Sequence, residues 1–215
     1  MRWLSRFFGL GFIVMGLFAW RYALLPQLPA PTTPISNNTR SETSATSATS
    51  RTNNATPTES IVKGMPLSAT YAYHFAKKVP AREQTLFKEA VAAYNQTGIV
   101  KLTAGAGGAT QNMVTFDVYH KQMATANNTF ELGRGGPQII RRYGLTTTTV
   151  NHANANLNLT YTEQLSLSVA MHELGHALGL DHSDEPTSVM YPVDQGVTTL
   201  SSADIAGLRA IYPPN

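Results

Sequence analysis

The segment from Thr160 to His182 constrains this chain more than any other, because it places three histidines in fixed register around one helix. It reads TYTEQLSLSVAMHELGHALGLDH, and no glycine or proline interrupts it before Gly175. Thr160 and Glu163 have the spacing of a capping box, and apolar residues then recur at helical spacing. The sequence therefore predicts a helix that presents the histidines.

His172 and His176 are four residues apart, so they project from one helix face within about 40° of each other and can bind one metal ion. Glu173 is rotated by about 100°, so its carboxylate would reach a metal-bound water and act as a general base. Gly179 can adopt the left-handed conformation that ends a helix, after which His182 supplies a third nitrogen. Three imidazoles leave a fourth position for water, which is typical of catalytic zinc.

The pattern HELGHALGLDH resembles the metzincin signature HExxHxxGxxH. Ser183 directly follows the third histidine as in matrixins, and SVMYP resembles the matrixin Met-turn, with Met190 expected beneath the zinc. The resemblance runs from about residue 66 to residue 213. It implies one catalytic zinc held by the three histidines, with Glu173 as the base of a metalloendopeptidase.

The same resemblance implies an α+β fold of the metzincin or zincin type, with a mixed twisted sheet of about five strands and three helices. Alternation and turn signals predict strands over 71–75, 99–103 and 113–119, and less clearly over 127–137 and 146–150. Helical spacing predicts a helix between Pro80 and Gly98, and the resemblance implies a last helix over 200–212. The glycine-rich pieces AGAGG and ELGRGG are expected to be turns or bulges, although 127–137 is also the candidate edge strand for an extended peptide.

The N-terminus has the charge order of an export signal, since Arg2 and Arg6 precede an uncharged apolar run from Phe7 to Trp20. Residues 1–25 are expected to form an apolar helix, either an uncleaved membrane anchor or a removed signal peptide. Residues 26–64 are rich in Ser, Thr, Asn and Pro and predict a disordered linker. The catalytic domain is then expected over 65–215.

Composition excludes several other kinds of function. There is no cysteine among the 215 residues, which excludes a disulfide framework, a thiolate ligand and latency through a prodomain cysteine. Residues 61–215 carry eleven basic and eleven acidic side chains, so the folded part has no basic footprint for nucleic acid. His120, His152 and Asp117 lack the family spacing of a second, structural zinc, and no compact Asp-rich loop supports a calcium site.

The sequence thus predicts a monomeric zinc endopeptidase that cleaves proteins or peptides outside the cytoplasm, at a cell surface or after secretion. Two alternatives stay open. One is a tethered surface module that keeps the motif but serves binding or adhesion. The other keeps the chemistry but is dedicated to one propeptide or to a cell-wall peptide.

Overall fold

The computed structural model describes residues 11–14, 55–123 and 130–214, and these form one compact unit. Its strands are β1 (Gly11–Val14), β2 (Thr70–Phe75), β3 (Lys101–Ala104), β4 (Asn112–Tyr119), β5 (Glu131–Gly136), β6 (Ile139–Arg142) and β7 (Thr148–Asn158). Its α-helices are α1 (Ala81–Gln96), α2 (Leu167–Leu178) and α3 (Ser202–Ile211). Two 3-10 segments, η1 (Ser60–Val62) and η2 (Leu159–Gln164), complete the described elements.

All seven described strands belong to one mixed sheet, in the order β1-β5-β7-β4-β2-β3, with β6 paired to β7. The pairs β2–β3, β2–β4 and β4–β7 are parallel, whereas β5 and β6 run antiparallel to β7. The prediction of an α+β fold with a mixed sheet and three helices is confirmed, and the sheet is larger than the five strands expected. The two additional strands are β1 and β6.

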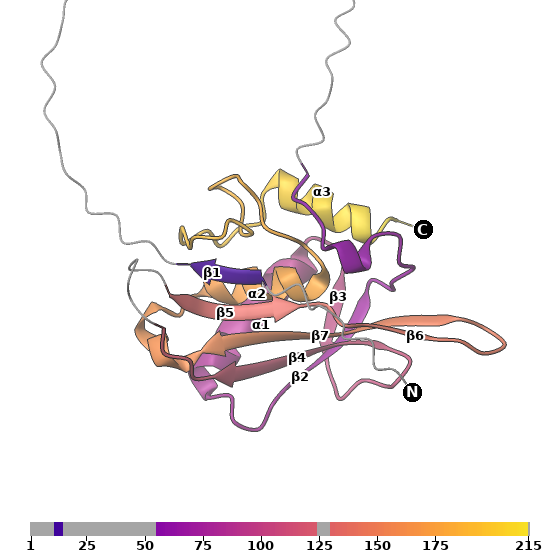
Figure 1. Cartoon of the computed structure of the whole chain (residues 1–215), viewed down its shortest axis with the longest axis horizontal. Helices are drawn as coiled ribbons and strands as arrows, with labels where there is room; N and C mark the ends of the chain where they lie inside the picture. Colours follow the sequence, from indigo (N-terminus) through magenta and orange to yellow (C-terminus); the bar gives the residue numbers. More distant parts are fainter. Residues whose placement is uncertain (1–10, 15–54, 124–129, 215) are drawn as a thin grey trace, which may run out of the picture. The chain divides into compact units, whose positions relative to one another are not determined.

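Helices α1 and α2 pack against each other and against the sheet, while α3 lies apart from the sheet near the C-terminus (Figure 1). The alternating burial of β4 directs Val114, Phe116 and Val118 inward. Phe116 stacks on Phe87 of α1, with ring centroids 4.3 Å apart. This core fixes α2, whose residues are almost all buried, against β5 and β7.

The start of α2 differs from the prediction. The Thr160/Glu163 pair lies in η2, and α2 begins after Ser166, whose hydroxyl accepts a hydrogen bond from Val169 N. Leu165 separates the two elements in an extended conformation. The capping-box spacing was therefore the wrong start signal, because Ser166 is the residue that satisfies a free N–H of the first turn.

The described residues include only four of the predicted N-terminal apolar helix, and these four are not helical. Gly11–Val14, within the predicted apolar helix, is the strand β1, which pairs antiparallel with β5. The rest of 1–25 and residues 26–54 lie outside the described residues. No helix among the described residues has the length and apolarity needed to cross a bilayer.

Residues 55–64 belong to the folded unit, although their composition predicted the end of a linker. Thr58 forms an antiparallel bridge with Leu180, and Thr56 N donates to Ala203 O at 3.0 Å. Thr56 and Glu59 are buried although both are polar. Val62 enters the core, and backbone hydrogen bonds and the buried polar side chains hold the rest of the segment, which is why composition did not reveal it.

Candidate functional site

Helix α2 brings two imidazoles together in the interior. His172 and His176 are 1% and 0% exposed, their ring centroids are 4.6 Å apart, and their Nε2 atoms are 2.9 Å apart. The four-residue spacing alone produces this arrangement, because residues i and i+4 lie above one another on a helix. The prediction that the two rings face one site is confirmed.

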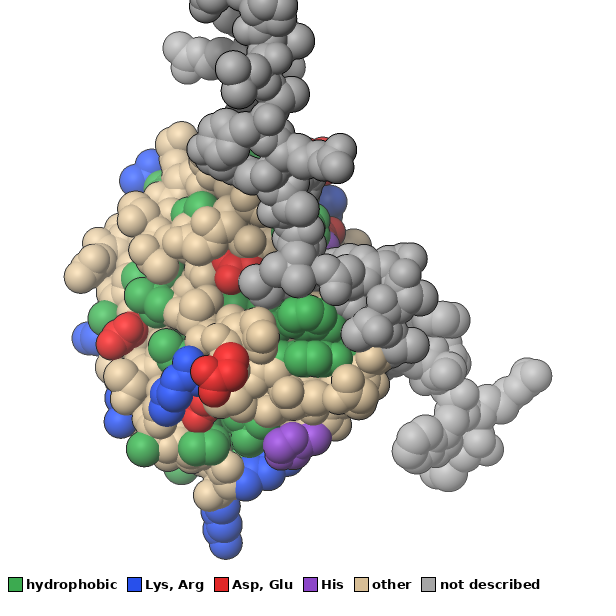
Figure 2. Space-filling model, turned by 90° about the vertical axis from the view of Figure 1, so that its left-hand side faces the viewer, with side chains coloured by type: hydrophobic (Ala, Val, Ile, Leu, Met, Phe, Trp, Pro, Cys, Tyr) green, Lys and Arg blue, Asp and Glu red, His purple; other side chains and the backbone are tan. Residues whose placement is uncertain are grey.

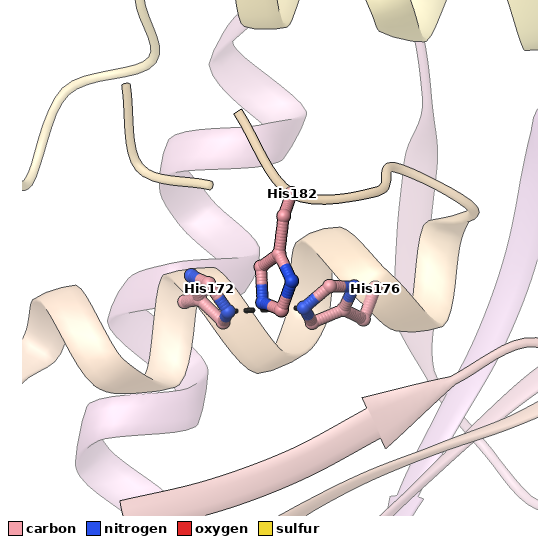
Figure 3. A group of neighbouring side chains, drawn as sticks. All are labelled: His172, His176 and His182. Atoms are coloured by element: carbon pink, nitrogen blue, oxygen red, sulfur yellow. Dashed lines mark hydrogen bonds between the residues drawn. The ribbon is translucent and has the colours of Figure 1, made fainter. Parts of the chain in front are cut away.

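The chain turns after α2 to bring in the third histidine. Gly179 has φ 103°, a left-handed conformation that ends the helix, and its N–H donates to Gly175 O and His176 O. His182 then points from the following loop toward the gap between the other two rings (Figure 3). Its ring centroid lies 5.3 Å from that of His172 and 4.8 Å from that of His176.

The hydrogen bonds of the two helical imidazoles define which ring nitrogens are free to bind a metal. His172 Nδ1 lies 2.8 Å from Val189 O and His176 Nδ1 lies 2.9 Å from Leu180 O, so both Nδ1 atoms carry the proton. Both Nε2 atoms therefore present lone pairs to each other at 2.9 Å. Two facing lone pairs repel unless a cation lies between them, and this fits a metal ion.

The three histidines form the one such group of metal-ligating side chains within the described part of the chain, with ligand atoms all within 4.8 Å of one another. Burial, and then the neighbouring His176, lowers the pKa of His172, which keeps its ring neutral as a metal ligand must be. Three nitrogen ligands, on two buried rings and one half-buried ring, with no fourth protein ligand among the described residues, fit a catalytic zinc.

The loop carrying Met190 packs under α2. Met190 is fully buried, and a Cβ added at Gly175 would lie 2.3 Å from its Sδ, so this contact requires a glycine. Met190 O accepts from Ser183 N at 3.0 Å, just past His182. Met190 thus packs against α2 at Gly175, and its place beneath the zinc stays a prediction.

A buried carboxylate joins this loop to α3. Asp204 Oδ1 accepts from Ser188 Oγ at 2.5 Å and from Thr56 Oγ1 at 2.6 Å, and Oδ2 accepts from Ser201 N at 2.9 Å. Oδ2 also accepts from Val189 N at 3.3 Å, and Val189 O is the partner of His172. Asp204 therefore connects the N-terminal segment, α3 and a metal ligand.

Glu173 is fully buried beside the histidines, against β5. Neither carboxylate oxygen has a hydrogen-bond partner among the described residues. Burial, and secondly the charge of Glu131, raises the pKa of Glu173 well above its ordinary value. A buried acceptor without a protein partner is suited to bind a water molecule and to exchange a proton with it.

Strand β5 comes this close to Glu173 because of its glycines. A Cβ at Gly133 would lie 2.6 Å from Glu173 Oε1, and a Cβ at Gly135 would lie 2.3 Å from Glu173 O. The expectation that ELGRGG is a turn or bulge is therefore wrong: these residues form a strand with room for α2. Strand β5 lies against α2, but β1 pairs with its outer side, so within the described residues β5 is not the edge strand that was expected.

A small pocket opens on the other side of His172. Its cavity volume is about 10 Å³, roughly what one water molecule needs. Asp194 stands in its wall, and its Oδ1 accepts from Ser168 Oγ at 2.7 Å. The lining also includes His172, Ser188, Val189, Tyr191, Val193, Gln195 and Val197. A cavity of this size beside a metal-ligating histidine has room for about one water molecule.

Three features of the site were missed by sequence reasoning. Glu59, Asp204 as a hub, and the glycines of β5 all act through contacts between residues distant in sequence. For Asp204 a local signal existed, because Ser201 and Asp204 have capping-box spacing and form that motif at the start of α3. Nothing local marks Glu59.

Comparison with known proteins agrees with this site. Residues 115–213 match the family model described as Matrixin. Rat (Rattus norvegicus) matrilysin is 54% identical over 50 residues, covering 21% of this chain and 19% of that protein. Rabbit (Oryctolagus cuniculus) macrophage metalloelastase is 50% identical over 48 residues, covering 20% of this chain and 10% of that protein. The matches thus span less than a fifth of these relatives.

Among solved structures, high choriolytic enzyme 1, a hatching enzyme zinc-protease from Oryzias latipes, aligns with a TM-score of 0.41 and 12% identity. The alignment covers 68% of this chain and 90% of that one.

Proposed function

We propose that this chain, a matrixin-like metzincin-type zinc metallopeptidase, is an endopeptidase that cleaves proteins or peptides at a cell surface or outside the cell. The observation that carries the proposal is one juxtaposition. Three imidazoles converge on a point, and Glu173, the residue after His172 in α2, has a buried carboxylate without a partner among the described residues. A structural zinc site is closed by four protein ligands, so it would have no need for a buried carboxylate without a partner.

The chemistry that zinc supplies at such a site is activation of a water molecule and polarisation of the substrate carbonyl. His172, His176 and His182 would hold the ion. Glu173 accepts the proton of the attacking water, because its raised pKa makes it a better base than an exposed carboxylate. Glu173 then returns that proton to the departing amine, and its burial keeps bulk water from competing for it.

An extended substrate fits the outer edge of β5. That edge accepts an antiparallel strand, because β1 pairs with it from Gly11–Gly135 to Val14–Glu131. The face of β5 that carries Gly133 and Gly135 packs on Glu173, so a peptide paired with β5 in place of β1 would lie near the metal-binding helix.

The N-terminal sequence supports a location outside the cytoplasm through its charge order. We place the catalytic domain after a tether, with its folded part beginning near residue 55 rather than 65. The size of the mature chain and its partition into membranes will show whether residues 1–25 are an anchor or a removed signal.

The test is hydrolysis of quenched fluorescent peptide libraries by the full chain, with zinc, after chelation, and after zinc is restored. Glu173→Gln keeps the size of the side chain and should bind zinc yet lose nearly all turnover. Glu89→Gln, on the exposed surface of α1, is the matched control and should behave as wild type. Wild-type turnover by the Glu173 variant would overturn the proposal.

The alternatives predict other outcomes in the same assay. A folded, zinc-loaded chain that cleaves no library peptide would support a surface binding module. Cleavage confined to one sequence, or to a cell-wall cross-link peptide added separately, would support the dedicated peptidase.

A further inference from the structure

The tip of the β6–β7 hairpin exposes two large hydrophobic side chains. Tyr143 is 74% exposed and Leu145 is 109% exposed, whereas Ile61, the other large hydrophobic of this kind among the described residues, is 41% exposed. The hairpin projects from the end of the sheet opposite β1 (Figure 1). Nothing else in the described part of the fold covers these two side chains.

The same tip carries positive charge. Arg141 and Arg142 precede Tyr143 and are exposed. Arg141 lies over the Tyr143 ring, 5.4 Å from its centroid, and Arg142 Nη1 donates to the backbone oxygen of Ala109 in the neighbouring loop. No acidic residue occurs in 132–162 or in 97–116, so neither chain segment at this end offsets the arginines.

The composition of the tip favours one kind of partner. A stable protein interface buries about 800 Å² on each side, and two side chains at a hairpin tip supply far less. A lipid surface requires only that an aromatic and an aliphatic side chain enter it while cations meet its phosphates. On the face shown in Figure 2, by contrast, hydrophobic side chains are dispersed among polar atoms and charges of both signs.

We propose that this hairpin tip binds an anionic lipid surface. Leu145 and Tyr143 enter the boundary between headgroups and acyl chains, and Arg141 and Arg142 contact the lipid phosphates. The contact is separate from the metal site and does not depend on peptidase activity. It would hold the folded unit at a membrane by its own surface, independently of the N-terminal segment.

The absence of cysteine allows a direct test at the tip itself. Thr146→Cys places a single thiol beside Leu145, where an environment-sensitive fluorophore can be attached. The full-length chain is mixed with vesicles of phosphatidylcholine alone and with vesicles that also contain phosphatidylglycerol. A fluorophore at Glu89→Cys, exposed on α1, reports any general association of the chain with the vesicles.

The expected result is a blue shift at position 146 with phosphatidylglycerol vesicles, reversed by high salt and absent at position 89. Adding Tyr143→Ser and Leu145→Ser should raise the lipid concentration needed for that shift roughly tenfold or more. Zinc-dependent hydrolysis should persist in this variant, which shows that it is folded. A shift equal on both vesicle types would contradict the proposed preference for an anionic surface and the contact of the arginines with its phosphates. No shift at 146 on either type, or a shift that survives the double substitution, would overturn the proposal and favour a protein partner.

Discussion

The carboxylate of Glu59 lies 3.6 Å from Nδ1 of His176, at the edge of the ring opposite the Nε2 atom that faces His172. Both side chains are buried, and Glu59 N also donates to Gly179 O at 2.8 Å, where α2 ends. A segment more than a hundred residues away in sequence thus supports one of the metal ligands. A carboxylate behind a ligating imidazole makes that imidazole a stronger donor to the metal.

Replacing Glu59 should therefore weaken zinc binding. Glu59→Gln keeps the volume of the side chain but removes its charge, and we expect zinc affinity to fall by roughly tenfold, with the fold intact. The measurement is competition between the protein and a zinc chelator of known affinity. Glu89→Gln is the control, and equal zinc affinity in both variants would show that Leu180 O alone orients the His176 ring.

Adding one methyl group to β5 should displace the proposed base. Gly133→Ala would place its Cβ 2.6 Å from Glu173 Oε1, so the Glu173 side chain must move. We expect kcat to fall by at least roughly tenfold, with zinc still bound. Gly105→Ala is the control, because its Cβ would have no neighbour within 4 Å. Unchanged turnover by the Gly133 variant would mean that Glu173 adjusts without loss of function.

Strand β1 should compete with peptide substrates, because both would pair with the same edge of β5. Proline removes a backbone donor, so the double variant Phe12→Pro, Ile13→Pro should weaken the β1–β5 pairing. We expect a lower KM with kcat unchanged, since the edge is freed while the site is untouched. A KM equal to that of the wild-type chain would show that β1 does not restrict access.

The metal-binding part of the site could be predicted from sequence because its determinants are local. The spacing of His172 and His176 and the left-handed Gly179 act within one helix and its end. Strand β7 carries a similar local signal, although a strand was predicted only over 146–150, at its start. Ala153, Ala155 and Leu157 are buried and alternate with polar residues, but the asparagines of this stretch disfavoured a strand.

Other parts could not be predicted because their determinants are tertiary. The glycines of β5 are required by the approach of α2, which no residue within β5 indicates. Residues 55–62 fold because their backbone bonds to Gly179, Leu180 and Ala203 and because Val62 enters the core, whereas most of their side chains resemble those of a linker. Composition indicates how much apolar surface a segment can bury. It does not indicate which backbone groups elsewhere in the chain will form hydrogen bonds with the segment.

The carboxylate of Asp204 should be required for both stability and zinc binding. Asp204→Asn would direct an amide N–H₂ toward donors on Ser188, Ser201 or Thr56 and leave them without an acceptor. We expect a loss of about 3 kcal/mol in unfolding free energy and weaker zinc binding, because the backbone at Val189 that orients His172 is released. Denaturant unfolding and chelator competition measure the two effects. Asp184→Asn, at an exposed position, is the control. Equal unfolding free energy and equal zinc affinity in the two variants would contradict the role of Asp204.

Alkaline pH should destabilise the fold through a buried tyrosine pair. Tyr71 and Tyr212 share a hydrogen bond of 2.8 Å, and Tyr212 OH donates to Leu178 O at the end of α2. Burial raises the pKa of Tyr71 to about 12 from its ordinary 10, so the folded chain holds a proton that the unfolded chain releases. That stabilisation, about 3 kcal/mol, is complete below pH 10 and is lost as the pH rises toward 12.

Tyr71→Phe removes this titration and two hydrogen bonds, one with Tyr212 OH and one from Asn151 Nδ2, so it should cost about 2 kcal/mol near neutral pH and flatten the decline in stability above pH 10. The measurement is urea unfolding at a series of pH values. Tyr73→Phe, in the same strand but partly exposed, is the control and should leave the alkaline decline as in the wild-type chain. If both variants keep the full decline, the alkaline sensitivity arises from the other buried tyrosines, Tyr94 and Tyr212, whose pKa values burial also raises.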